Sequence, residues 1–181
     1  MRILIIANMR SGSTTLLKWL GIELGYKTIN ELHNPLFPVE FDLESNDFIV
    51  KEIYHHIKDI PNYISKFDKV LTLTRTDTFD SAVSLLYCDE KPNYDYHSNY
   101  KINDKWISDR INELHRIEKE FVKQNKDIVS IDAFHITYEG IFKTKTELKK
   151  LCEYLNIDVN NLKASELLNN NNRYRNNNKM I

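Results

Sequence analysis

The side chains best placed to do chemistry lie between residues 8 and 20, directly after the apolar run 3–7. That run predicts a buried strand, and the turn at Gly12 then leads into an amphipathic helix. Backbone N–H groups at such a helix start are unpaired and lie at the positive end of the helix dipole, where phosphate and sulfate groups bind. Gly12 lets the backbone approach an anion closely, and Arg10 adds a fixed positive charge. The remaining residues of the expected anion loop are Ser11, Ser13, Thr14 and Thr15.

The spacing of this loop disfavours an ordinary ATPase or GTPase. The phosphate loop of those enzymes reads Gly-x-x-x-x-Gly-Lys-Ser/Thr, whereas residues 10–17 contain one glycine and no lysine before the hydroxyls. The string from Arg10 to Leu17 resembles instead the 5′-phosphosulfate loop of sulfotransferases that use 3′-phosphoadenosine 5′-phosphosulfate (PAPS). Its Arg-Ser-Gly-Ser-Thr form is similar to that of tyrosylprotein sulfotransferases and of the trehalose sulfotransferase-like group. Taken alone, the loop also fits a glycine turn that binds no ligand.

A second motif follows the β-branched run 70–74, which reads as a strand. Arg75 comes next, then a helical pattern for which Asp77 is the expected N-cap. Strand, Arg75, helix and Ser84 resemble the element of PAPS sulfotransferases that holds the 3′-phosphate, with Arg75 and Ser84 nine residues apart. The alternative is that Arg75 only pairs with Asp77 or Asp80 at the surface. The apolar stripe of the helix consists of Phe79, Ala82, Val83 and Leu86.

A third motif, Tyr138-Glu139, precedes a helix expected over 143–155. In the sulfotransferase superfamily a Tyr-Glu pair stands at this point, where the tyrosine contacts the adenine and the glutamate supports the fold. The resemblance therefore implies that Tyr138 binds the cofactor. The three motifs come in the order of the superfamily, which strengthens each of them.

Length and composition bound the remaining possibilities. The chain has 181 residues, enough for one domain, expected over 1–168 and followed by an Asn-rich tail, 169–181. With 25 basic and 26 acidic residues, the net charge of −1 does not favour nucleic acid as a partner. The sequence has no long apolar run, so we expect neither a signal peptide nor a membrane anchor. The protein is therefore expected to be soluble and cytoplasmic. Cys88 and Cys152 have no metal-ligand spacing, and Cys152 is expected in the core.

Strands and helices alternate along the chain. We expect strands at 2–7, 26–29, 47–53, 69–74 and 127–131, and helices at 14–24, 57–66, 77–88, 103–124 and 143–155. Such alternation predicts an α/β fold with three αβα layers and a central parallel sheet. The resemblance specifies the P-loop NTPase-like fold of sulfotransferases. Ligands of such sheets bind beyond the carboxyl ends of the strands, where Arg10 and Arg75 both lie, so one shared nucleotide site is expected.

The implied reaction is an in-line displacement through a loose transition state, like phosphoryl transfer. Negative charge grows on the bridging oxygen of the leaving phosphate, and cations must stabilise it. The resemblance gives this task to Arg10 and to Lys51, which stands near the end of the strand 47–53. No metal is required by this chemistry.

The base that takes the proton of the acceptor hydroxyl is less directly indicated. Cytosolic sulfotransferases use a histidine two residues after the lysine, but this chain has Ile53 there. In tyrosylprotein and trehalose-type enzymes the base is a glutamate beyond the first helix. Glu31, which follows Arg10 by 21 residues, occupies that region. His33, His55 and His56 are the alternative bases.

The acceptor is not identified by sequence beyond a hydroxyl of a sugar, phenol or tyrosine. Tyr94, Tyr96 and Tyr100 have the aromatic density of a sugar- or phenol-binding edge, or they serve packing. Arg173, Arg175 and Lys179 either close over the 3′-phosphate or form a solvated tail. Two other functions stay open: a nucleotide or nucleoside kinase with a degenerate loop, and a non-catalytic module that binds the product, 3′-phosphoadenosine 5′-phosphate (PAP).

Overall fold

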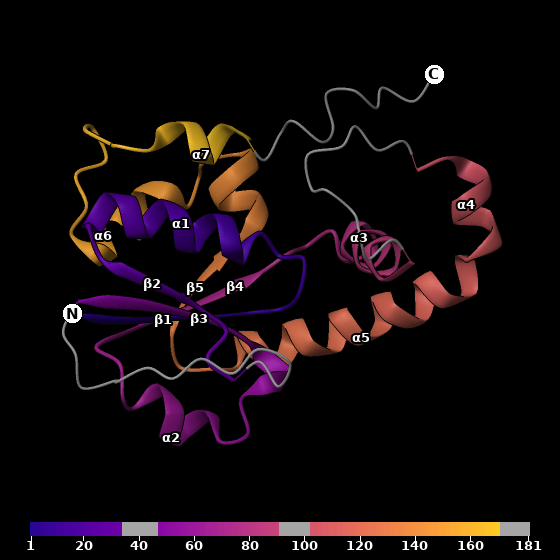
Figure 1. Ribbon diagram of the computed structural model, residues 1–181, viewed down its shortest axis with the longest axis horizontal. Coiled ribbons are helices and arrows are strands. Elements are labelled where there is room, and N and C mark those ends of the chain that lie inside the picture. Colours follow the sequence, from indigo (N-terminus) through magenta and orange to yellow (C-terminus); the bar gives the residue numbers. More distant parts are fainter. Residues whose placement is uncertain (34–46, 91–101, 171–181) are drawn as a thin grey trace.

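The central element of the molecule is one parallel sheet with the strand order β2-β3-β1-β4-β5. The computed structural model describes residues 1–33, 47–90 and 102–170. Helices cover both faces of the sheet (Figure 1), so the predicted three-layer αβα class is confirmed. The strands are β1 (Arg2–Ala7), β2 (Lys27–Asn30), β3 (Phe48–Ile53), β4 (Lys69–Thr74) and β5 (Phe134–Thr137). The helices are α1 (Ser13–Leu24), α2 (Ile60–Ile64), α3 (Thr78–Glu90), α4 (Asp104–Asp109), α5 (Ile111–Val129), α6 (Leu148–Leu155) and α7 (Ser165–Asn170).

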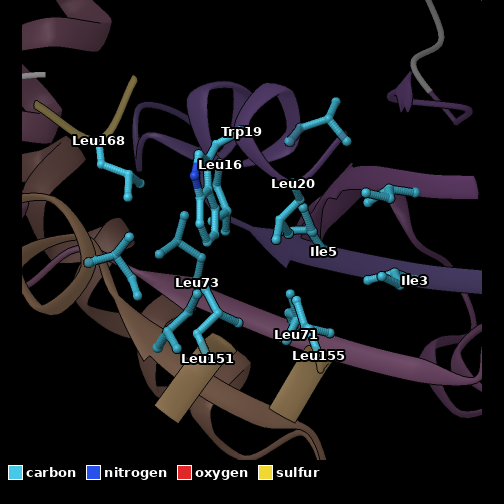
Figure 2. Packing of buried hydrophobic residues seen from close by; sticks show 14 of the residues in the cluster. Ile3, Ile5, Leu16, Trp19, Leu20, Leu71, Leu73, Leu151, Leu155 and Leu168 are labelled. Atoms are coloured by element: carbon cyan, nitrogen blue, oxygen red, sulfur yellow. The ribbon is translucent and has the colours of Figure 1, made fainter. Parts of the chain in front are cut away.

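Strand β1 lies at the centre of the sheet and is buried on both faces. Because side chains alternate along a strand, Ile3 and Ile5 pack with α1, α6 and α7, while Leu4 and Ile6 pack on the side of α2. Figure 2 shows the first of these clusters, in which Trp19 of α1 stands over the sheet. Burial on both faces explains why residues 3–7 form an unbroken apolar run.

Helix α3 is fixed near the carboxyl end of β4 by a third apolar cluster and by its cap. Oδ1 of Asp77 accepts the backbone N–H of Asp80 at 3.0 Å, which confirms the predicted N-cap. The cluster joins α3 to α5 through Ala82, Val83, Leu86, Leu114 and Phe121. The orientation of α3 decides where Ser84 lies.

The prediction of a strand at 127–131 is wrong, because α5 continues to Val129 and β5 begins only at Phe134. The buried residues of α5 are Leu114, Phe121 and Ile128, each seven positions from the next. This helical spacing outweighs the β-branched composition around Ile128. The helix expected over 103–124 is also two helices, separated at Arg110.

Two other helices are shorter than expected. Helix α2 begins at Ile60 because Asp59 caps it by accepting from the N–H of Asn62, with a proline in its first turn. A short 3₁₀ turn, Tyr54–His56, precedes it. The helix expected from 143 begins at Leu148, after the π-helical turn Glu139–Lys143.

Cys152 is 1% exposed and belongs to the core, as predicted. Among the residues that the structure describes, none of the helices has both the length and the apolar composition needed to cross a bilayer. The tyrosines at 94, 96 and 100 and the basic residues at 173, 175 and 179 lie outside the described residues.

Candidate active site

The residues singled out by sequence gather at one edge of the sheet, where the parallel strands end. The loop 8–12 follows β1, Arg75 follows β4, and Tyr138 follows β5. Glu31 follows β2, and Lys51 lies in β3 beside Asn30 of β2. Parallel β–α topology thus brings together residues that are far apart in sequence.

The loop after β1 has two residues in the left-handed backbone region: Arg10 with φ of 61° and Gly12 with φ of 84°. A Cβ atom at Gly12 would come within 2.7 Å of Cδ2 of Tyr138. Gly12 therefore serves both the turn and the close approach of the Tyr138 ring. The ring also lies 5.1 Å from that of Phe142.

Arg10 connects the loop with α3. Its Nε donates to Oγ of Ser84 at 2.9 Å. Its carbonyl oxygen accepts from Nη1 of Arg75 at 3.3 Å. The two segments that the sequence assigned to the 5′ and the 3′ ends of one nucleotide are therefore in direct contact.

Arg75 is held on several sides. Its Nη2 pairs with Oδ2 of Asp80 at 2.7 Å, so the ion pair considered from sequence is present. Its guanidinium lies over the ring of Tyr138 at 4.7 Å. Nε of Arg75 is buried and has no hydrogen-bond partner among the described residues. A buried donor without a partner costs free energy.

Asn125 of helix α5 contacts both the loop after β1 and the segment after β4. Nδ2 of Asn125 donates to the carbonyl oxygen of Arg75 at 2.9 Å, and Oδ1 of Asn125 accepts from Nδ2 of Asn8 at 2.8 Å. Oδ1 of Asn8 is buried without a partner within the described part of the chain. Sequence reasoning missed Asn125, because nothing in a helical pattern marks a contact with two distant loops.

The hydroxyls of the anion loop have different surroundings. Ser11 is buried, and its Oγ donates to the carbonyl oxygen of Asn8 at 2.7 Å, so this hydroxyl stabilises the loop itself. Ser13 is buried, Thr15 is half-buried and Thr14 is exposed at the helix start. In the described residues no side chain caps α1 at Gly12. Gly12 therefore leaves room at the start of α1, the part of a helix where anions bind.

Lys51 is a buried lysine whose charge is paired. Its side chain is 3% exposed; its Nζ forms an ion pair with the carboxylate of Glu31 and donates to Oδ1 of Asn30 at 3.1 Å. The backbone N–H of Glu31 donates in turn to the carbonyl oxygen of Lys51 at 2.7 Å. Two residues that sequence reasoning assigned separately to catalysis therefore form one unit.

The three candidate histidines lie in the segments that follow β2 and β3. His33 contacts Glu52, with Nδ1 and Oε1 3.0 Å apart. The rings of His55 and His56 meet edge to face at 4.5 Å in the turn after β3. Burial and the neighbouring His56 lower the pKa of His55, while the charge of Glu31 acts in the opposite direction.

Glu139 has the supporting role that the resemblance implied for it. Its Oε2 accepts the backbone N–H of Thr76 at 3.0 Å, and Oε1 pairs with Lys143. Burial alone would raise the pKa of Glu139, but the hydrogen bonds from Thr76 and the charge of Lys143 lower it overall. Glu139 thus fixes the backbone directly after Arg75.

Sequence reasoning also missed Glu52, whose side chain is fully buried. A signal for it existed. Lys51 and Glu52 are adjacent charged residues inside the otherwise apolar strand Phe48–Ile53, and a buried strand keeps charges only where they have partners.

No protein-family model and no curated protein sequence matches the chain. Among solved structures, mouse sulfotransferase SULT7A1 complexed with PAP aligns with a TM-score of 0.54 and 15% identity, over 92% of this chain and 62% of the mouse chain. Shikimate kinase from Bacteroides thetaiotaomicron aligns with a TM-score of 0.45 and 14% identity, over 86% of this chain and 98% of the kinase.

The chain has a sulfotransferase-like fold. At 15% identity, the likeness to the mouse enzyme concerns the fold and not the activity. This chain spans less than two thirds of the length of that enzyme.

Proposed function

We propose that the chain is a sulfotransferase that moves the sulfuryl group of PAPS to a hydroxyl acceptor. The observation that carries this proposal is the contact between Arg10 and Ser84, 2.9 Å from Nε to Oγ. It unites the anion loop with the Arg75–Ser84 element. One nucleotide with phosphates at both ends of its ribose would satisfy both.

The residues present fit such a ligand. The start of α1 and the hydroxyls of Ser13 and Thr14 suit the 5′-phosphosulfate. Arg75 and Ser84 suit the 3′-phosphate, and Nε of Arg75, which has no partner among the described residues, provides a donor for it. Tyr138, which lies under the Arg75 guanidinium, is the residue proposed to contact the adenine.

In the proposed reaction the bond between sulfur and the bridging phosphate oxygen breaks while a bond from sulfur to the acceptor oxygen forms. Arg10 and Lys51 stabilise the charge that grows on the leaving phosphate, and PAP is released. Glu31 accepts the proton of the acceptor hydroxyl. For Glu31 to do so, Lys51 must turn from its carboxylate toward the sulfuryl group, because a tight ion pair weakens a carboxylate as a base.

The test is direct turnover. The chain is incubated with PAPS and a panel of sugars, phenols and tyrosine peptides, and PAP and sulfated product are quantified with and without EDTA. We expect stoichiometric PAP and product, and no loss of rate with EDTA. Transfer from ATP with a strict Mg²⁺ requirement would instead indicate a kinase. Tight binding of PAP with no transfer to any acceptor would favour the binding module.

A further inference from the structure

Glu52 is a fully buried carboxylate in the middle layer of the fold. Its Oε1 accepts the backbone N–H of His33 at 3.2 Å and the hydroxyl of Tyr63 at 3.2 Å, and lies 3.0 Å from Nδ1 of His33. Its Oε2 is buried without a partner among the described residues. Burying a carboxylate costs several kcal/mol unless its hydrogen bonds compensate. A buried glutamate in a strand is therefore expected where its contacts serve a structural or functional role.

Neighbouring residues of β3 hold the end of β2 from opposite faces of the sheet. Since side chains alternate along a strand, Lys51 lies on the face that packs against α1, and Glu52 lies on the face that packs against α2. Lys51 binds Asn30 and Glu31, and Glu52 binds His33 twice. The segment 30–33 is therefore clamped on both sides.

The clamped segment contains an unfavourable backbone conformation. Glu31 has φ of 61°, in the left-handed region that costs a non-glycine residue about 1–2 kcal/mol. Such conformations persist where surrounding contacts over-determine them, and they are concentrated at functional sites. The N–H of Glu31 is fixed by the carbonyl of Lys51, and the contacts of His33 fix the chain two residues later.

We infer that Glu52 is a positioning residue, which acts through His33 to hold the left-handed turn at Glu31 and so directs the Glu31 carboxylate into the transfer site. The catalytic part of this inference rests on the proposed sulfotransferase function. The ring of Tyr63 meets that of His33 edge to face at 4.7 Å and keeps the imidazole against Glu52. From here on, the clamp means the contacts among Glu52, His33 and Tyr63, on the face of the sheet opposite Lys51.

The variants that test the clamp are His33→Ala, His33→Asn, Glu52→Gln and the double variant His33→Ala/Glu52→Gln. Alanine removes the side-chain bond to Glu52, whereas the asparagine amide can donate from nearly the same place as Nδ1 without acting as an imidazole base. We expect His33→Ala to lower kcat about ten- to hundredfold, since small displacements of a catalytic group have effects of this size. The affinity for PAP should not change, and His33→Asn should recover most of the rate.

Amide hydrogen exchange at Glu31 gives a readout that does not depend on catalysis. Its N–H is bonded to the carbonyl of Lys51, so loss of the clamp should speed its exchange about tenfold or more in His33→Ala, but not in His33→Asn. Glu52→Gln keeps an oxygen that can accept from His33 but loses the charge that strengthens these bonds, so it should speed exchange by less than His33→Ala does. The double variant should resemble His33→Ala, because contacts in one network are not additive.

Each contrary result would overturn one of the claims made for the clamp. Parental kcat and exchange in His33→Ala would show that the clamp positions nothing. A His33→Asn variant as slow as His33→Ala, with protected exchange at Glu31, would make His33 itself the proton acceptor. Fully additive effects in the double variant would show that Glu52 does not act through His33. If no acceptor is sulfated, the proposed function fails, and the exchange pattern alone still decides whether the clamp exists.

Discussion

Nε of Arg10 donates to Oγ of Ser84 across 74 positions of sequence. The contact brings the guanidinium of the anion loop to the helix that carries the second half of the proposed nucleotide site. Arg75 also donates to the carbonyl oxygen of Arg10. An anion bound by one of these two arginines would therefore affect the contacts of the other.

Arg10→Ala should lower turnover about 10²–10³-fold, the usual effect of losing a group that stabilises transition-state charge. PAP affinity should fall much less, because the charge on the bridging oxygen grows only during transfer. Arg10→Lys, which keeps the charge, is the matched control and should retain a larger share of the rate. Unchanged turnover with weaker PAP binding would make Arg10 a binding residue only.

Asp80→Asn should strengthen PAP binding about three- to tenfold, roughly 0.6–1.4 kcal/mol. The Asp80 carboxylate pairs with Nη2 of Arg75 at 2.7 Å and would compete with a 3′-phosphate for that guanidinium. Asp77→Asn removes the same charge from the same helical turn and preserves an N-cap, so it should have a smaller effect. Calorimetric titration with PAP measures both variants. Weaker binding in Asp80→Asn alone would show that the ion pair orients Arg75 and does not compete.

Glu31→Gln should slow transfer about 10²–10⁴-fold, the range for loss of a general base. The glutamine oxygen can still accept from Lys51, which keeps the buried ammonium hydrogen-bonded. PAP affinity should therefore hardly change, and a thermal melt serves as the folding control. A near-parental rate, together with an inactive His55 or His56 variant, would transfer the role of base to that histidine.

The stability of the fold should depend on pH through Glu139. Its pKa is below the ordinary 4.5 in the folded chain, so the unfolded chain binds more protons in the acid range. Its stabilising contribution is therefore complete above the ordinary value and is lost as pH falls through the lowered one. The difference in unfolding free energy between the parent and Glu139→Gln should shrink between about pH 6 and pH 3 in urea titrations. A difference that stays constant would contradict the bonds to Thr76 and Lys143 as its source.

Part of the candidate site could be predicted from sequence because its residues follow strands. Arg10 lies three residues after the apolar run 3–7, Arg75 directly follows the run 70–74, and parallel topology gathers strand ends at one edge. Tyr138 came only from the resemblance of the Tyr-Glu pair, because no strand was predicted directly before it. The extension of α5 to Val129 was missed because β-branched residues near Ile128 suit a strand as well, and only packing on the spacing of Leu114 and Phe121 decides. Contacts such as Glu52 with His33 depend on which face of the sheet each side chain occupies, and local sequence does not reveal that pairing.

The measurement that bears most directly on the sulfotransferase proposal is the affinity for PAP against that for ADP, which lacks the 3′-phosphate. Calorimetry should show PAP binding at least tenfold more tightly, about 1.4 kcal/mol, because Arg75 and Ser84 supply donors for that phosphate. Arg75→Ala and Ser84→Ala should each reduce the preference. Ser81→Ala should preserve it, because the Ser81 hydroxyl donates to the backbone carbonyl oxygen of Asp77, directly before α3. Equal affinities for PAP and ADP in the parent chain would contradict the proposed 3′-phosphate site and, with it, a sulfotransferase that uses PAPS.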